Sequence, residues 1–180
     1  TYSYGESITP LDNLSQTGYV FSGWTWYNTL AGTTISIPST MPDYDLIVEG
    51  SFTKGSFTIT YYVDGRQAKQ ESYDYGASVA NFTPTVEGYT FHGWYSDLDY
   101  KNQYQIPSSM PAFSIAAYGY TTLNSYTVTY QVDGEQVKQE SYEYGTAITP
   151  YTYIKTGYTV SAWSPGIPAA MPAENLVFNA

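Results

Sequence analysis

The sequence contains few side chains of the types that carry out catalysis. It has one histidine, His92, and no cysteine, so zinc sites and histidine-assisted nucleophiles lack their usual ligands and bases. Two acidic segments, Asp97-Leu-Asp99 and Asp43-Tyr-Asp45, supply carboxylates of the kind that glycoside hydrolysis and calcium binding need. Neither segment recurs along the chain, and Lys101 occupies the position where a calcium loop needs a third oxygen ligand. The sequence therefore predicts no catalytic residue, no metal site and no cofactor.

A second group of side chains is suited to binding rather than to reaction. Aromatic rings beside Asp, Asn and Gln are typical of surfaces that bind sugars or proteins. The candidate ligand-binding residues are Trp26, Tyr95, Asp97, Asp99, Tyr100 and Tyr104. The sequence leaves open whether these rings face a ligand or only cover the loop that carries them.

Composition and charge narrow the range of partners. Of the 180 residues, 42% are apolar and 22 are tyrosine, which suits half-buried sheet surfaces. The 16 acidic residues outnumber the 6 basic ones, and the net charge of -10 repels the phosphates of nucleic acid. No apolar run approaches the ~20 residues of a membrane span. We therefore expect no nucleic-acid partner and no direct insertion into a membrane.

The elements that carry these residues belong to one repeated unit. The segment Tyr61-Tyr-Val-Asp-Gly65 returns as Tyr130-Gln-Val-Asp-Gly134, 69 positions later, and Lys69-Gln-Glu-Ser-Tyr73 returns at the same offset. Met110-Pro111 returns after only 61 positions, so the third copy has a shorter loop before this point. A period near 70 with strand-like patterning predicts a series of small domains.

The copies set the expected domain boundaries. We assign the first repeat to 1–55, the second to 56–124 and the third to 125–180. The first repeat opens with Tyr2-Ser-Tyr4-Gly5, which matches Tyr73-Asp-Tyr75-Gly76, and so it lacks its N-terminal hairpin. The third repeat has a shortened loop and a truncated C-terminal end. Because both ends fall inside a repeat, we expect neighbouring domains of the same larger chain.

Each full repeat is predicted to contain four strands and at most one short helix. Residues 57–63 and 126–132 alternate between apolar and polar side chains. Asp64-Gly65 and Asp133-Gly134 follow them and favour hairpin turns in which both central residues have positive φ. The other strands are expected at 67–73 and 136–142, at 88–94, and at 46–52, 113–118 and 176–178. His92 is predicted to be an ordinary residue of the 88–94 strand.

Residues that recur between copies are assigned to the fold. Trp24, Trp94 and Trp163 occupy one position and are predicted to lie in the core, because repetition favours a packing role. The structural repeat motif comprises Asp64, Gly65, Gly88, Tyr89, Trp94, Asp133, Gly134, Gly157, Tyr158 and Trp163. Any specific activity is therefore expected in the loops where the copies differ.

The order of these motifs resembles a known family. Tyr-x-Val-Asp-Gly, Tyr-Gly, Gly-Tyr-x-Phe-x-Gly-Trp and then Met-Pro before a closing strand are similar to the internalin B-repeat, also called the Listeria/Bacteroides repeat. The resemblance covers essentially the whole chain and implies a mainly β protein of tandem, small β-grasp-like domains with little or no helix. The third copy departs from it, because Ala162-Trp163 replaces Gly-Trp and Val160 replaces the Phe.

The resemblance implies a non-enzymatic module of a secreted or cell-surface bacterial protein. The leading hypothesis is a stalk, spacer or adhesion segment, since the recurrent residues are those of the fold. The alternative is a module that binds a glycan or a host surface protein through the variable aromatic loops. An extracellular location is expected in either case.

Overall fold

The chain consists of strands and loops. The computed structural model describes all residues from Thr1 to Ala180 and contains ten strands and no helix. Accordingly, no helix of the length and apolar character needed to cross a membrane is present. The mainly β class predicted from the sequence is confirmed, while the short helix allowed for each repeat does not form. The likeness to the β-grasp fold stays a prediction.

Two compact units divide the chain, and their limits do not follow the repeat boundaries. The first unit comprises Thr1–Tyr61, Ala68–Asn81 and Ile106–Ala116. The second unit comprises Tyr62–Gln67, Phe82–Gln105 and Ala117–Ala180. The second repeat therefore contributes residues to both units.

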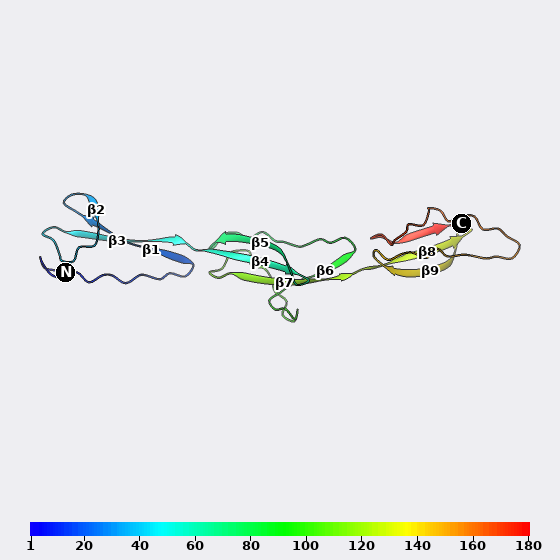
Figure 1. Cartoon of the computed structure of the whole chain (residues 1–180), viewed down its shortest axis with the longest axis horizontal. Helices are drawn as coiled ribbons and strands as arrows, with labels where there is room; N and C mark the ends of the chain where they lie inside the picture. The colour runs from blue at the N-terminus through cyan, green and yellow to red at the C-terminus, as the bar shows by residue number, and fades with distance from the viewer. The chain divides into compact units, whose positions relative to one another are not determined.

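A three-stranded antiparallel sheet forms the first repeat. Its central strand is β1 (Tyr19–Asn28), which pairs with β2 (Thr33–Ile35) and β3 (Leu46–Lys54) (Figure 1). The strand order is β2-β1-β3, so β3 is an edge strand of this sheet. Among residues 1–55, Ile8 is the only hydrophobic residue that is buried.

The predicted hairpins open the second and third repeats. They are β4 (Ser56–Val63) with β5 (Arg66–Asp74), and β8 (Ser125–Val132) with β9 (Glu135–Glu143). Asp64 and Gly65 have φ of 50° and 75°, and Asp133 and Gly134 have φ of 51° and 86°, as the predicted turn type requires.

The first strand of each hairpin is buried more completely than alternation predicts. Thr60 and Thr129, expected on the polar face, are only 9% and 8% exposed. In the third repeat the amide of Gln139 on β9 donates to the Thr129 hydroxyl at 3.1 Å, so a polar side chain covers this face. Burial also raises the pKa of Tyr61 on β4 from its ordinary value of 10.0 to about 12.

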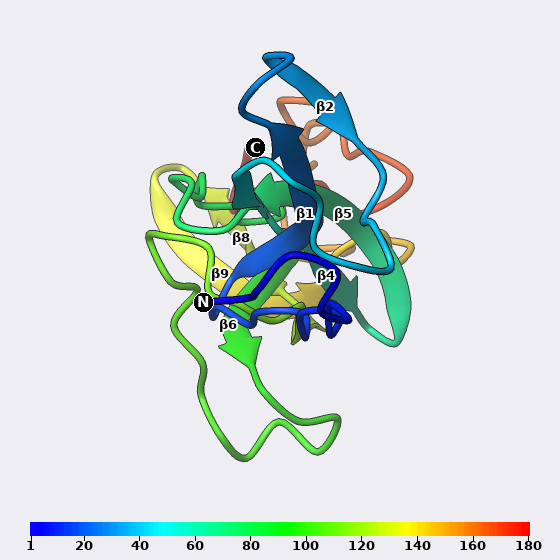
Figure 2. The ribbon, with the colours of Figure 1, turned by 90° about the vertical axis from the view of Figure 1, so that its left-hand side faces the viewer.

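The second repeat contains all four predicted strands. Its sheet has the order β5-β4-β7-β6, with β6 at Tyr89–Tyr95 and β7 at Ile115–Leu123. The last strand was expected at 113–118 but starts later and continues to Leu123, because its second half pairs with β6. After β6 the chain leaves the sheet as a projecting loop before it returns to β7 (Figure 2).

The third repeat keeps the hairpin but lacks the third strand. The strand β10 (Leu176–Asn179) pairs in parallel with β8, and Phe178 lies opposite Tyr130 in a core with Val128, Ile148 and Met171. In the second repeat, residues 89–91 of the third strand pair with 121–123 of β7. The equivalent segment, 158–160, is not part of a strand, and the counterparts of residues 121–123 would lie beyond Ala180, the last residue of the sequence. One element of the pairing survives, since Ser164 and Asn179 exchange two backbone hydrogen bonds of 2.8 Å.

Candidate functional site

The recurrent tryptophans make the same hydrogen bond in every repeat. In each case the indole Nε1 donates to the backbone carbonyl twelve residues earlier. The bonds are Trp24 to Asp12 (3.0 Å), Trp94 to Phe82 (2.8 Å) and Trp163 to Tyr151 (2.7 Å). Each indole thereby fixes the Pro-containing connection that precedes it. The donor and the acceptor belong to the same repeat.

Four aromatic rings form a cluster at the base of the projecting loop of the second repeat. Tyr120 on β7 stacks on His92 with centroids 4.7 Å apart and a 12° interplanar angle. Tyr120 also contacts Tyr100 at 4.8 Å and Tyr95 at 5.8 Å. Partial burial and the neighbouring Tyr120 hydroxyl raise the pKa of Tyr95. Two of the candidate ligand-binding residues, Tyr95 and Tyr100, are therefore brought together by the fold.

Asp97 holds the loop in shape. Its two carboxylate oxygens accept hydrogen bonds from the backbone N–H groups of Lys101 at 3.0 Å and Asn102 at 2.8 Å. These bonds, the one from Lys101 first, lower the pKa of the Asp97 carboxyl. Tyr100 lies inside this turn with a φ of 54°, a conformation that costs free energy in a non-glycine residue. Asp97 thus has a structural role in presenting the Tyr100 ring.

The carboxylates of the 97–99 segment contact groups of their own loop. Asp99 lies beside Lys101, whose Nζ is 3.1 Å from the Asp99 carboxylate, and both groups are exposed. Nowhere in the chain do three or more His, Asp or Glu side chains lie close enough together to hold a metal ion. The backbone carbonyl of Asp45 accepts a hydrogen bond of 2.7 Å from the Thr29 hydroxyl.

The remaining candidates, Trp26 and Tyr104, are not among the four rings of the cluster. Trp26 belongs to β1 in the first unit and lines a cavity of about 360 Å³ with apolar neighbours such as Ile8, Met41 and Val48. Tyr104 is on the return of the projecting loop, where its N–H donates to the Trp94 carbonyl at 2.7 Å.

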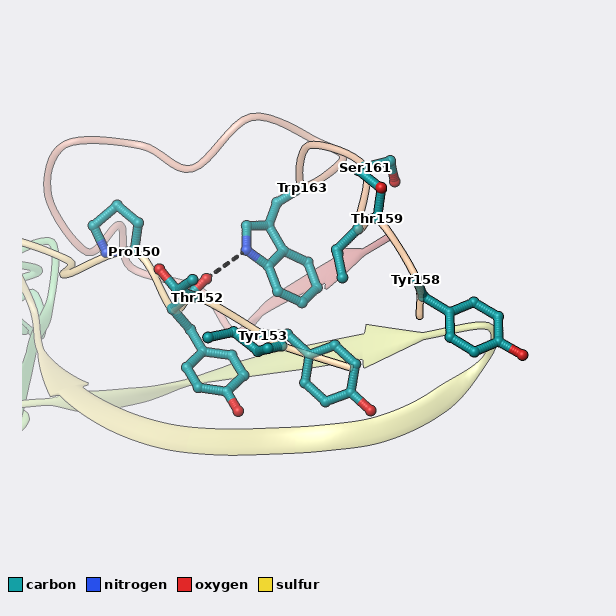
Figure 3. Close-up of a pocket in the computed structure, with 10 residues that line it drawn as sticks. Pro150, Thr152, Tyr153, Tyr158, Thr159, Ser161 and Trp163 are labelled. Atoms are coloured by element: carbon teal, nitrogen blue, oxygen red, sulfur yellow. Dashed lines mark hydrogen bonds between the residues drawn. The ribbon is translucent and has the colours of Figure 1, made fainter. Parts of the chain in front are cut away.

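The third repeat has an open cavity where its third strand does not form. The cavity measures about 540 Å³ and lies between residues 150–154 and 158–163, with Tyr153, Tyr158 and Trp163 among its lining side chains (Figure 3). In the second repeat Phe91 packs edge-on against Trp94 at 4.9 Å in the equivalent place. Val160 takes the position of Phe91 in the third repeat. The lining side chains carry no charge, so the cavity offers hydroxyls, rings and aliphatic groups.

The side chain of Asp64 joins its hairpin turn to β7. Its carboxylate accepts hydrogen bonds from both the N–H of Thr121 at 2.9 Å and the Thr121 hydroxyl at 2.7 Å. These bonds fasten the hairpin turn to β7. The equivalent Asp133 makes a backbone bond to the Ala180 carbonyl at 3.1 Å.

A charged triplet recurs on the second strand of both hairpins. Lys69 lies 2.9 Å from Glu71, and Lys138 lies 2.8 Å from Glu140. The hydrogen bond from the lysine is the main cause that lowers the pKa of each glutamate. A tyrosine hydroxyl completes the triplet, with Tyr142 donating to Glu140 at 3.1 Å. Its recurrence marks this arrangement as part of the fold.

Sequence reasoning missed His92 and Tyr120 as members of the aromatic cluster. His92 lies in strand β6 as predicted, and in addition its Nε2 lies 2.7 Å from the Thr122 hydroxyl and its ring is stacked on Tyr120. Tyr120 lies on the other side of the loop in sequence, so only the pairing of β6 with β7 places it there. One signal was available, since His92 is unique in the chain.

Comparison with known proteins gives a family match in three places. The family described as the Listeria-Bacteroides repeat domain matches residues 1–48, 57–118 and 126–166. These three segments lie in tandem and each contains one of the recurrent tryptophans.

Similar curated proteins are much longer than this chain. Internalin H of Listeria monocytogenes serovar 1/2a is 35% identical over 112 residues, which is 60% of this chain and 20% of the relative. A putative Gly-rich membrane protein of Evansella cellulosilytica is 27% identical over 185 residues, 90% of this chain and 21% of its own length. A putative membrane protein of the same organism is 25% identical over 170 residues, 89% of this chain and 26% of its own length. The chain thus spans between a fifth and about a quarter of these relatives.

Proposed function

Since the chain belongs to the Listeria-Bacteroides repeat domain family, we propose that it is a non-enzymatic module of a bacterial cell-surface protein and acts there as a spacer. The narrower likeness to internalin B-repeats is part of this proposal and is supported by the identity to Internalin H. An extracellular location belongs to the same proposal.

One observation carries the spacer function. The side chains that recur in equivalent positions are engaged within the fold, as the three indole hydrogen bonds illustrate. The candidate ligand-binding residues, by contrast, are present in single copies and differ between repeats. A repeated ligand site would require its binding residues to recur, whereas a spacer requires only the fold.

A replacement experiment in the parent protein tests the spacer function. The segment is exchanged for unrelated β repeats of equal length, and adhesion of the bacteria to their target surface is measured. A spacer permits this exchange with adhesion retained, whereas a shortened replacement lowers it. Loss of adhesion with the full-length replacement would show that this segment itself makes the contact.

The aromatic cluster of the second repeat favours a second function, the binding of a glycan or a host surface protein. Its rings lie on a loop that Asp97 already holds in shape, so binding would cost little ordering entropy. Tyr100 is only partly buried. Glycan-array and host-protein binding assays of the chain test this function. A signal abolished by Tyr100→Ala but retained by Tyr153→Ala in the third repeat would support binding through this loop, and silence in both assays would contradict it.

A further inference from the structure

The Gly-Tyr and Tyr-Gly motifs meet where one repeat passes into the next. The first joint consists of Gly18, Tyr19, Gly55 and Tyr75, all within the first compact unit. The Gly55 N–H donates to the Gly18 carbonyl at 2.8 Å, and the Tyr75 N–H donates to the Gly55 carbonyl at 2.8 Å. The Tyr75 ring lies directly over Gly18, and it meets Tyr19 edge-on at 5.7 Å.

The second joint repeats this arrangement residue by residue. It consists of Gly88, Tyr89, Asn124 and Tyr144, all within the second compact unit. Asn124 N–H donates to the Gly88 carbonyl at 2.8 Å, and Tyr144 N–H donates to the Asn124 carbonyl at 2.9 Å. Tyr144 meets Tyr89 edge-on at 6.5 Å. The same contacts occur twice, which indicates a specific interaction between adjacent repeats.

The joints explain why glycine is required in the motif. A Cβ on Gly18 would lie 2.3 Å from the Tyr75 ring, and a Cβ on Gly88 would lie 2.2 Å from the Tyr144 ring. No side chain fits at these distances. Both glycines also have positive φ, 79° and 74°, which L-residues rarely adopt.

In the third repeat the sequence ends before a following repeat, so the counterpart of this surface has no tyrosine over it. Gly157 has a φ of 81°, but nothing lies within 4 Å of the position of its Cβ. Tyr158 beside it is 69% exposed. At the start of the chain Tyr4, the counterpart of Tyr75 and Tyr144, is 80% exposed. The backbone conformation of the glycine is therefore present without a covering tyrosine.

We propose that the Gly-Tyr turn of each repeat is an interaction surface for the tyrosine of the Tyr-Gly motif in the following repeat, and that this contact couples the two repeats. The partner that fits the surface is thus another copy of the repeat. The motif residues Gly88 and Tyr89 act between repeats as well as within the fold. This inference does not depend on the spacer function, because it concerns contacts inside the chain.

Two glycine substitutions separate the contact from backbone strain. Gly88→Ala introduces both a strained φ and a clash with Tyr144, whereas Gly157→Ala introduces the same strain without the clash. Amide hydrogen exchange of the Asn124 and Tyr144 N–H groups reports on the second joint. We expect Gly88→Ala to accelerate exchange of these two amides at least about tenfold relative to the amides of β8, and Gly157→Ala to leave them unchanged. Equal exchange rates in the two variants would overturn the proposal.

A double substitution keeps the test decisive if Gly88→Ala folds poorly. Tyr144→Ala removes the ring and opens the joint by itself, and we expect the same acceleration at Asn124. In the Tyr144→Ala background, Gly88→Ala should add no more than Gly157→Ala adds to the wild-type chain, because the clash is gone. Tyr4→Ala, at an exposed tyrosine of the same motif, is the control and should change neither amide. Fully additive effects of Gly88→Ala and Tyr144→Ala would contradict the coupling.

Discussion

The second and third repeats begin alike and end differently. Both have the same hairpin, a fully buried tyrosine on its first strand, and a buried methionine, Met110 or Met171, before the last strand. In the second repeat the third strand, β6, pairs with the second half of β7, and its counterpart β1 in the first repeat pairs with β3. In the third repeat the sequence ends at Ala180, before the residues that would pair with 158–160. The comparison teaches that the hairpin and the Met-Pro segment form the same buried core in both repeats, whereas the third strand is seen where the residues that pair with it are present.

The largest expected effect is a loss of stability when the buried methionine shared by the two repeats is replaced. Met110 and Met171 are each 1% exposed, so Met110→Ala and Met171→Ala should each cost about 2 to 5 kcal/mol. Urea denaturation followed by the NMR amide signals of each repeat measures both losses. Leu98→Ala, at a residue 66% exposed, is the control and should cost less than about 0.5 kcal/mol. If the two losses differ by more than about 2 kcal/mol, the two cores are not equivalent.

The next largest effect is a difference in amide hydrogen exchange at the third strand, where the two repeats differ. The amides of residues 121–123 in β7, opposite β6, should exchange with solvent at least about 100-fold more slowly than the amides of Thr159 and Val160, which lie outside any strand. The reason is that the first set lies in a paired ladder and the second set does not. Hydrogen exchange followed by mass spectrometry or NMR measures this ratio. The Ser164 amide, which donates to Asn179 at 2.8 Å, is the internal control and should be protected. Equal exchange of both sets would show that the third repeat forms the strand in solution.

The smallest effect is a dependence on pH that both hairpins should share. The pKa values of Glu71 and Glu140 are lowered by their lysines, so these carboxylates stabilise the fold above about pH 4.5 and lose this contribution as the pH falls through their lowered pKa. Glu71→Gln should therefore reduce stability at pH 6 by at most about 1 kcal/mol and have no effect at pH 3. Thermal unfolding at the two pH values measures the difference. A larger loss at pH 3 than at pH 6 would have the wrong sign for this ion pair.

Local patterns in the sequence predicted the parts of the fold that local chemistry determines. The Asp-Gly pairs gave the turns at Asp64 and Asp133, because positive φ at two successive positions is a property of those residues themselves. The recurrence of Trp94 and its counterparts indicated a packed role, which the indole hydrogen bonds now define. The order of the strands in the second repeat could not be obtained in this way, since it depends on pairing between distant segments.

Contacts between distant segments were also not predicted for the candidate ligand-binding residues. Asp97 was selected as an acid beside aromatic rings, but its partners are backbone N–H groups that only the folded loop brings to it. Tyr95 and Tyr100 were named together because they are close in sequence, while Tyr120 was missed because its proximity comes from β7. The role of Gly88 between repeats was equally hidden, because Tyr144 lies far along the chain.

The parallel pairing of β8 with β10 has a mechanical consequence. The chain enters the third repeat through β8 and leaves it through β10, and residues 176–179 lie beside 128–131 in the same direction. Tension applied along the chain therefore slides the two strands past each other, and their hydrogen bonds must break together rather than one after another. A pulling force meets the whole ladder at once, a geometry that suits the proposed spacer function.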